Sequence, residues 1–206
     1  MRATIRNLIF DVGSVLIGYR WKEMLTNDFG IEDSHAEEIG HWMFEDPIWE
    51  DFDRGSVDTD ELIDHYCGLY PEDSETIKRM ILEGERMMVR RDTLWKRIEE
   101  LKESGFKIFI MSNYSEFLFK KHTEPIPFMD KLDGMVVSYE VHMLKPEPGI
   151  YEHLLKKYSL VPEECLFYDD RQENVDAAIR MGIQSVQVTS EEMLVKELGK
   201  VINEEI

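Results

Sequence analysis

Leu8-Ile9-Phe10-Asp11-Val12-Gly13-Ser14-Val15-Leu16 is the stretch that decides the fold, because its β-prone apolar run ends at a single carboxylate. Three later apolar runs are also followed by polar groups. Ser112 and Asn113 follow 106–111, Lys145 lies shortly after 135–139, and Asp169 and Asp170 follow 165–168. Open α/β sheets bind ligands at the carboxyl ends of their strands. If these strands are parallel in one sheet, the polar groups converge at one edge.

The composition is that of a folded, strongly acidic protein. The chain has 206 residues, 43% of them apolar, which is enough for a single core with or without an inserted domain. Its 43 acidic and 24 basic residues leave a net charge of −19, so nucleic acids and anionic membranes are not expected as partners. An anionic substrate has to be attracted by local groups, and a divalent cation would serve.

Redox state and location are predicted from what the sequence contains. Cys67 and Cys165 are far apart, and we expect two reduced thiols rather than a disulfide. No apolar segment has the length of a membrane span or a signal peptide. We therefore expect a cytoplasmic protein, a monomer or a homodimer.

Periodicity divides the chain into two kinds of structure. After a predicted strand at 5–10, apolar residues follow helical spacing from Trp21 to about Val89, with no convincing strand. From Arg91 onward, helices alternate with strands predicted at 106–111, 135–139, 165–168 and 183–188. This alternation predicts an α/β protein with a parallel sheet covered on both faces. The helical block is then an insertion after the first strand.

Three aspartates carry the candidate chemistry. The carboxylate of Asp11 can attack a phosphoryl group to form an aspartyl-phosphate that water hydrolyses, although an Asp at this place can also simply cap the following turn. Asp169 and Asp170, together with Asp11, offer the hard oxygen ligands that Mg²⁺ prefers. The alternative for the Asp169-Asp170 pair is a solvated acidic turn.

The other candidates would neutralise phosphate charge. Lys145 could pair with both the phosphate and a nucleophilic Asp, or could be an ordinary solvated loop lysine. Ser112 and Asn113 offer a hydroxyl, an amide and backbone N–H groups near the start of a helix, where anions bind. The alternative is an ordinary helix cap.

Taken together, these residues resemble the haloacid dehalogenase superfamily, whose four motifs occur here in order. Asp11 lies in the first motif, Ser112 in the second, Lys145 in the third, and Asp169-Asp170 in the fourth. The stretches 144–151 and 167–174, with Asp53-Arg54-Gly55, are similar to the branch that contains bacterial glucose-1-phosphate phosphatases. The resemblance implies a Rossmann-like parallel-sheet core, residues 1–17 plus 90–206, and an all-helical cap domain, residues 18–89.

The resemblance also implies a Mg²⁺-dependent phosphatase of small phosphorylated metabolites, plausibly sugar phosphates. Metal ligands are implied at Asp11, the backbone carbonyl of Gly13, and Asp170. Asp169 is expected close by, and Asn174 is expected next to the metal site. Dehalogenation is not expected, because dehalogenases of the family need no Mg²⁺ whereas the Asp169-Asp170 pair suits a metal.

Gly13 departs from the usual phosphatase pattern, in which a second Asp acts as general acid and base. The carbonyl ligand survives this change and the proton donor does not, and such donors contribute about 10²–10⁴-fold to rates. Three possibilities stay open: a substrate with a good leaving group, another proton donor, or a weakly active or inactive protein that binds phosphate and metal. A phosphomutase ranks low, because it would need the missing Asp.

The predicted cap is rich in aromatic residues, most of which should pack in its interior. Residues 41–54 lack a clean helical period, and we expect them to form the lip that closes over substrate. None of the six histidines is assigned a role.

Overall fold

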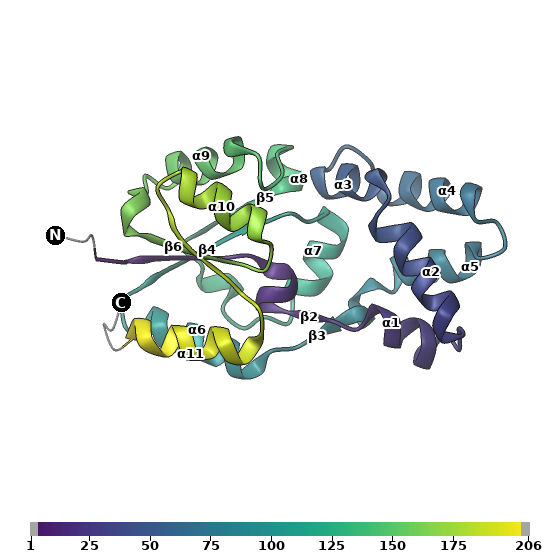
Figure 1. Cartoon of the computed structure of the whole chain (residues 1–206), viewed down its shortest axis with the longest axis horizontal. Helices are drawn as coiled ribbons and strands as arrows, with labels where there is room; N and C mark the ends of the chain where they lie inside the picture. Colours follow the sequence, from purple (N-terminus) through teal and green to yellow (C-terminus); the bar gives the residue numbers. More distant parts are fainter. Residues whose placement is uncertain (1–3, 203–206) are drawn as a thin grey trace.

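The structure is a computed structural model that describes residues 4–202, with a five-stranded sheet at its centre (Figure 1). The strands are β1 (Asn7–Phe10), β4 (Lys107–Ser112), β5 (Gly134–Val137), β6 (Cys165–Asp169) and β7 (Gln184–Gln187). They lie in the order β5-β4-β1-β6-β7, and each neighbouring pair is parallel. The predicted α/β fold with a parallel sheet is confirmed. The strand that precedes Asp11 is its central strand.

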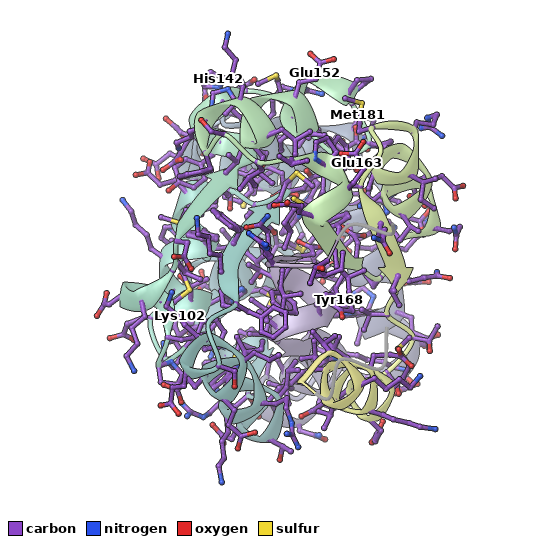
Figure 2. The ribbon with its side chains drawn as sticks, turned by 90° about the vertical axis from the view of Figure 1, so that its left-hand side faces the viewer. Lys102, His142, Glu152, Glu163, Tyr168 and Met181 are labelled. Carbon is purple, nitrogen blue, oxygen red and sulfur yellow. The ribbon has the colours of Figure 1, made fainter. Side chains whose placement is uncertain are left out.

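Helices cover both faces of the sheet because side chains alternate along each strand. In β1, Leu8 and Phe10 pack into one hydrophobic layer and Ile9 into the other. The first layer is closed by α6 (Asp92–Glu103), α7 (Glu116–Thr123) and α11 (Glu191–Ile202), and the second by α9 (Pro148–Lys157) and α10 (Gln172–Arg180). Within the first layer Tyr168, which Figure 2 labels, belongs to β6. Its ring stacks on that of Phe10, with ring centroids 5.2 Å apart.

We call the segment 18–89 the insertion, and its helices lie at the opposite end of the molecule from the start of β1 and the end of α11 (Figure 1). Its helices are α1 (Trp21–Glu23), α2 (Asp33–Phe44), α3 (Pro47–Arg54), α4 (Thr59–Leu69) and α5 (Ser74–Leu82). Short helical turns lie at Val12–Leu16, Met24–Asp28, Gly84–Met87, Met129–Lys131 and Pro162–Glu164.

No helix within residues 4–202 combines the length and the apolar character needed to cross a membrane.

Two short strands inside the insertion were not predicted. β2 (Gly18–Tyr19) and β3 (Met88–Val89) pair antiparallel, with Tyr19 opposite Met88. Two residues are too few for a period of two to be recognised in the sequence. β2 lies where the chain enters the insertion and β3 where the chain leaves it. Their pairing therefore holds Tyr19 next to the sheet.

The structure corrects one predicted boundary and defines the helices of another segment. The strand predicted at 135–139 ends at Val137, and α8 (Ser138–Val141) follows it directly. The segment 41–54, whose sequence lacks a clean helical period, completes α2 and forms α3. The sequence does contain residues typical of a helix start at α3. The Asp46 side chain caps the helix by accepting a hydrogen bond from Ile48 N, and Pro47 occupies the first turn.

Candidate active site

The sequence-predicted residues meet at the carboxyl edge of the sheet. Asp11, Ser112 and Asp169 lie at the ends of three adjacent strands, β1, β4 and β6, and Lys145 reaches them from the loop after α8. Carboxylate oxygens of Asp11, Asp169 and Asp170 lie within 4.8 Å of one another. A cavity of about 450 Å³ opens over them, lined by Asp11, Gly13, Asn113, Lys145, Asp170, Asn174 and residues of the insertion. We call it the carboxylate cavity.

Within residues 4–202, the hydrogen bonds and the ion pair of the Asp11 side chain are all made through one oxygen. Oδ1 accepts from Val12 N at 2.7 Å and from Ser112 Oγ at 2.6 Å, and lies 3.0 Å from Lys145 Nζ. The capping interpretation is therefore correct, yet these contacts leave Oδ2 out. Asp11 is only 8% exposed, and burial raises its pKa to about 7 although Lys145 opposes the shift. This poorly solvated carboxylate, with one oxygen outside the contacts above, is part of the cavity wall.

The turn after Asp11 is held by residues that follow the insertion in the sequence. Arg91 Nη1 donates to Ser14 O at 2.8 Å and to Val15 O at 2.7 Å, and Trp95 Nε1 donates to Leu16 O. These contacts fix the backbone around Gly13 without placing a side chain in the cavity.

Lys145 is buried between two carboxylates. Its Nζ lies 3.0 Å from Asp11 Oδ1 and 2.6 Å from Asp169 Oδ2, and the residue is 3% exposed. Burial opposes a charged lysine, but Asp11 and Asp169 outweigh it and raise the pKa of Lys145. The amide of Asn113 brackets this residue, accepting from Lys145 N at 2.7 Å and donating to Lys145 O at 2.8 Å. The alternative of a solvated loop lysine is thereby wrong.

At the end of β6, the neighbouring residues Asp169 and Asp170 have different surroundings. Both oxygens of Asp169 are engaged, because Oδ2 accepts from Lys145 and Oδ1 accepts from Arg171 N and Asn174 Nδ2, each at 2.9 Å. Asp170 lines the carboxylate cavity, and burial, with Asp169 beside it, raises its pKa. Asp170 is therefore freer than Asp169 to bind a ligand.

The donor set fits a hard divalent cation. Asp11 and Asp170 are carboxylates whose charge is disfavoured as they stand, and a cation between them would relieve this. Asn174 Oδ1 is buried and has no hydrogen-bond partner in the described part of the chain. An unpaired buried oxygen is costly, and a metal-bound water would satisfy it.

Asp53, at the end of α3, also borders the carboxylate cavity, although no role is predicted for it from the sequence. Its Oδ1 accepts from Ser115 N at 3.0 Å, which places it at the start of α7. Burial raises the pKa of Asp53 to about 7, and Asp11 contributes to the rise. The only signal in the sequence was the stretch Asp53-Arg54-Gly55. The same stretch also anchors the insertion, because Arg54 binds Glu147 through both carboxylate oxygens at 2.7 and 3.2 Å.

The hydroxyl of Tyr19 lies where a side chain at position 13 would point. A Cβ built on Gly13 would be 2.8 Å from Tyr19 Oη, so the absence of a side chain makes room for this phenol. Tyr19 Oη is 2.5 Å from Tyr114 Oη, which is 2.7 Å from His122 Nδ1. His122 Nε2 is 2.8 Å from the carbonyl of Gly84 and must donate to it. With His122 neutral, since burial lowers its pKa, Tyr114 donates to Nδ1 and Tyr19 donates to Tyr114.

We expect Asp53→Asn to raise stability at alkaline pH. The folded pKa of Asp53 lies above its unfolded value, so between pH 4 and 7 the native state holds more protons and the free energy of unfolding falls as pH rises. Asn keeps the acceptor for Ser115 N without the charge. Wild type and variant should differ little near pH 4, and the variant should gain about 2 kcal/mol by pH 8, solvent in the cavity screening part of the effect.

Urea denaturation in EDTA at several pH values measures this difference. Asp51→Asn, an exposed carboxyl on the same helix, is the control and should show no such trend. A difference between Asp53→Asn and wild type that stays constant from pH 4 to pH 8 would contradict the assignment.

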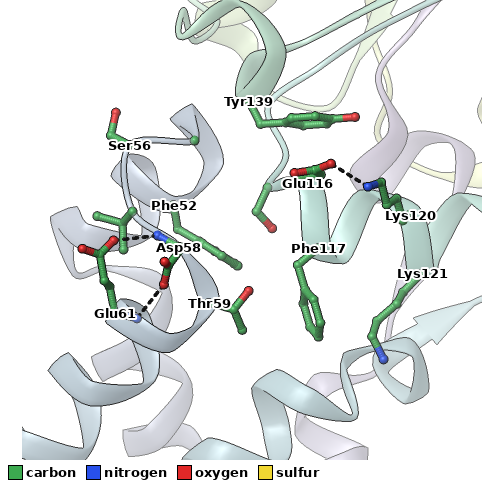
Figure 3. A pocket seen from close by; sticks show the side chains of 13 residues that line it. Phe52, Ser56, Asp58, Thr59, Glu61, Glu116, Phe117, Lys120, Lys121 and Tyr139 are labelled. Atoms are coloured by element: carbon green, nitrogen blue, oxygen red, sulfur yellow. Dashed lines mark hydrogen bonds and ion pairs between the residues drawn. The ribbon is translucent and has the colours of Figure 1, made fainter.

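A larger cavity, of about 610 Å³, lies outside this site between α4 and α7 (Figure 3). The charges on its wall are already paired. Asp58 and Glu61 form a capping box with each other's backbone N–H groups, and Lys120 pairs with Glu116. Since these groups are engaged with each other, the carboxylate cavity is the better candidate for chemistry.

Comparisons with known proteins give the family of this chain. Residues 5–182 match the haloacid dehalogenase-like hydrolase family. The chain is 27% identical to a sesquiterpene phosphatase of Aspergillus oryzae over 98% of its own length and 99% of the relative's. It is 22% identical to a D-ribitol-5-phosphate phosphatase of Bacteroides thetaiotaomicron, covering 97% and 99%. A HAD family enzyme of the same bacterium, solved with magnesium and inorganic phosphate, superposes with a TM-score of 0.70 at 23% identity, covering 90% of this chain and 95% of that one.

Proposed function

Because this chain belongs to the haloacid dehalogenase-like hydrolases, we propose that it is a Mg²⁺-dependent phosphatase of small phosphorylated metabolites. One observation carries the proposal: the carboxylate of Asp11 borders the cavity with Oδ2 free while Ser112 and Lys145 hold Oδ1. A carboxylate held in this way is oriented for attack. The phosphatases among the relatives support the same reaction class.

Five residues are proposed for the metal site. Asp11, the carbonyl of Gly13 and Asp170 would hold Mg²⁺, with Asp169 and Asn174 beside it. When bound, the cation would neutralise phosphate charge and permit an anionic ester to approach an acidic site. The engaged oxygens of Asp169 make it the residue that orients Lys145 and Asn174.

The proposed reaction has two displacements at phosphorus. Asp11 Oδ2 attacks the phosphoryl group, the bond to the substrate's alcohol oxygen breaks, and an aspartyl-phosphate forms. Water then attacks the same phosphorus and releases phosphate and free Asp11. Lys145 and Ser112 offset negative charge on the carboxylate side. The amide of Asn113, which is predicted to help neutralise phosphate charge, is hydrogen-bonded to the backbone of Lys145 and would also position that residue.

Tyr19 is the group we propose in place of the missing general acid. Tyr19 Oη lies 2.8 Å from the Cβ position built on Gly13. This is close to the distance between Cβ and a carboxylate oxygen within an aspartate side chain. In the first displacement Tyr19 would give its proton to the leaving alcohol oxygen, and Tyr114 would turn its own hydroxyl hydrogen to the phenolate. In the second, the phenolate would take a proton from the attacking water.

We therefore expect Tyr19→Phe to change the dependence on the leaving group. Turnover of alkyl phosphates should fall by about 10²-fold, because an alkoxide leaves poorly without a proton, whereas p-nitrophenyl phosphate should be hydrolysed at nearly the wild-type rate. Steady-state kinetics with both esters tests this. Tyr158→Phe, which removes a hydroxyl that binds Met135, is the matched control. Equal losses for both esters would assign Tyr19 a structural role only.

The substrate and the domain division stay proposals. Sugar phosphates are the class suggested by the likeness to glucose-1-phosphate phosphatases, and the sesquiterpene phosphatase among the relatives suggests apolar esters as well. Residues 18–89 are proposed as the cap over a core of residues 1–17 plus 90–206. The predicted cytoplasmic location and the monomer or homodimer also stay predictions.

Phosphate release from a panel of phosphate esters, with Mg²⁺ and with EDTA, tests the proposed function. The expected result is hydrolysis that requires Mg²⁺. If Mg²⁺ and phosphate bind but no ester is hydrolysed, the protein is instead the binding protein that Gly13 left as an alternative.

A further inference from the structure

A second cavity, of about 330 Å³, adjoins the carboxylate cavity. The two share Tyr19, Phe44, Trp49, Asp53 and Asn113 on their walls. The alcohol portion of an ester bound with its phosphate at Asp11 would therefore lie beside this second space. We call it the apolar subsite.

Aromatic and aliphatic groups make up most of its wall. Beyond the shared residues, the wall consists of Trp21, Met87, Tyr114, Leu118 and His122. The polar atoms of Tyr19, Tyr114 and His122 bind one another and the carbonyl of Gly84. The subsite thus offers few free hydrogen-bonding groups to a ligand.

The wall is packed against its own neighbours. Phe44 lies edge-to-face with both Trp21 and Trp49, at centroid distances of 5.5 and 4.8 Å. Leu118 fills the space beside Gly84, where an added Cβ would lie 2.5 Å from its Cδ2. A wall held in this way is preformed and does not have to be ordered when a ligand binds.

We propose that the apolar subsite binds the hydrocarbon portion of the substrate, so that the physiological ester is the monophosphate of an apolar branched or cyclic alcohol. This inference rests on the proposed phosphatase function. A sugar in the same place would bury hydroxyl groups without partners, which disfavours binding. A hydrocarbon would remove its own surface and that of Phe44 and Trp49 from water.

Two esters of primary alcohols that differ mainly in hydroxyl groups test the inference. Cyclohexylmethyl phosphate and glucose 6-phosphate both present a six-membered ring on a CH₂–O–phosphate group. We expect kcat/KM for cyclohexylmethyl phosphate to be at least about tenfold higher. Acetyl phosphate, too small to need the subsite, reports on the phosphoryl-transfer site alone.

Two variants assign the preference to this cavity. Leu118→Asn and Met87→Ser each place a polar group in the apolar subsite, away from the carboxylates. Each should lower kcat/KM for cyclohexylmethyl phosphate by about tenfold and leave acetyl phosphate turnover close to wild type, which also shows that the variant is folded. Either variant alone is sufficient if the other does not fold.

The outcomes separate this inference from the function on which it rests. Hydrolysis of acetyl phosphate with glucose 6-phosphate preferred, or equal to cyclohexylmethyl phosphate, would overturn the apolar substrate class and keep the phosphatase. An apolar preference that both folded variants retain would overturn the assignment to this cavity. Failure to hydrolyse any of the three esters would reject the phosphatase, and the inference with it.

Discussion

Asp11→Asn should lower the rate of Mg²⁺-dependent p-nitrophenyl phosphate hydrolysis by at least about 10³-fold. The amide is a poor nucleophile, so the aspartyl-phosphate cannot form. The fold should persist, because the Asn Oδ1 can still accept from Val12 N and from Ser112 Oγ. p-Nitrophenolate leaves without a proton, so the measurement does not depend on which residue replaces the general acid that is missing at Gly13.

The assay compares wild type, Asp11→Asn and Asp130→Asn, an exposed Asp far along the chain, each with Mg²⁺ and with EDTA. Wild type and Asp130→Asn should release nitrophenolate only with Mg²⁺. If Asp11→Asn keeps more than a tenth of the wild-type rate, another group is the nucleophile. If wild type releases nothing at any Mg²⁺ concentration, the phosphatase proposal fails.

Lys145→Ala should be the most destabilising single change at the site. It leaves Asp11 and Asp169 buried beside each other without the cation that pairs both. Removing one partner of a buried ion pair typically costs about 3–5 kcal/mol. The loss should be smaller at pH 5 than at pH 8, because the pKa of Asp11 is already raised by burial and rises further without Lys145, so that Asp11 is neutral at the lower pH.

Urea denaturation in EDTA at both pH values measures this effect. Lys120→Ala is the matched control, because Lys120 pairs with Glu116 on the exposed face of α7 and should contribute little. Added Mg²⁺ should restore part of the stability of Lys145→Ala, since it supplies positive charge to the same carboxylates. A variant as stable as wild type at pH 8 would contradict the central role of Lys145.

Asp53 and Tyr19 mark the limit of prediction from sequence. Tyr19 lies in a two-residue strand, β2, whose partner is about 70 residues away, and Tyr114 is 95 residues from Tyr19. No local pattern encodes such a contact. Asp53 is held at the site by contacts between insertion and core, among them Arg54 with Glu147 and Ser115 N with Asp53 itself.

What the sequence determined by itself was the sheet, its helices and the set of polar residues at one edge of it. The spacing of the apolar residues and the order of the strands and helices suffice for this, because parallel strands separated by helices must end on the same side of the sheet. Only the tertiary structure decided which oxygen of Asp11 is free, that Asn113 holds Lys145, that Tyr19 lies at Gly13, and that aromatic residues wall the neighbouring cavity. These depend on how the insertion packs on the core, and such packing is set by the shapes of side chains distant in sequence.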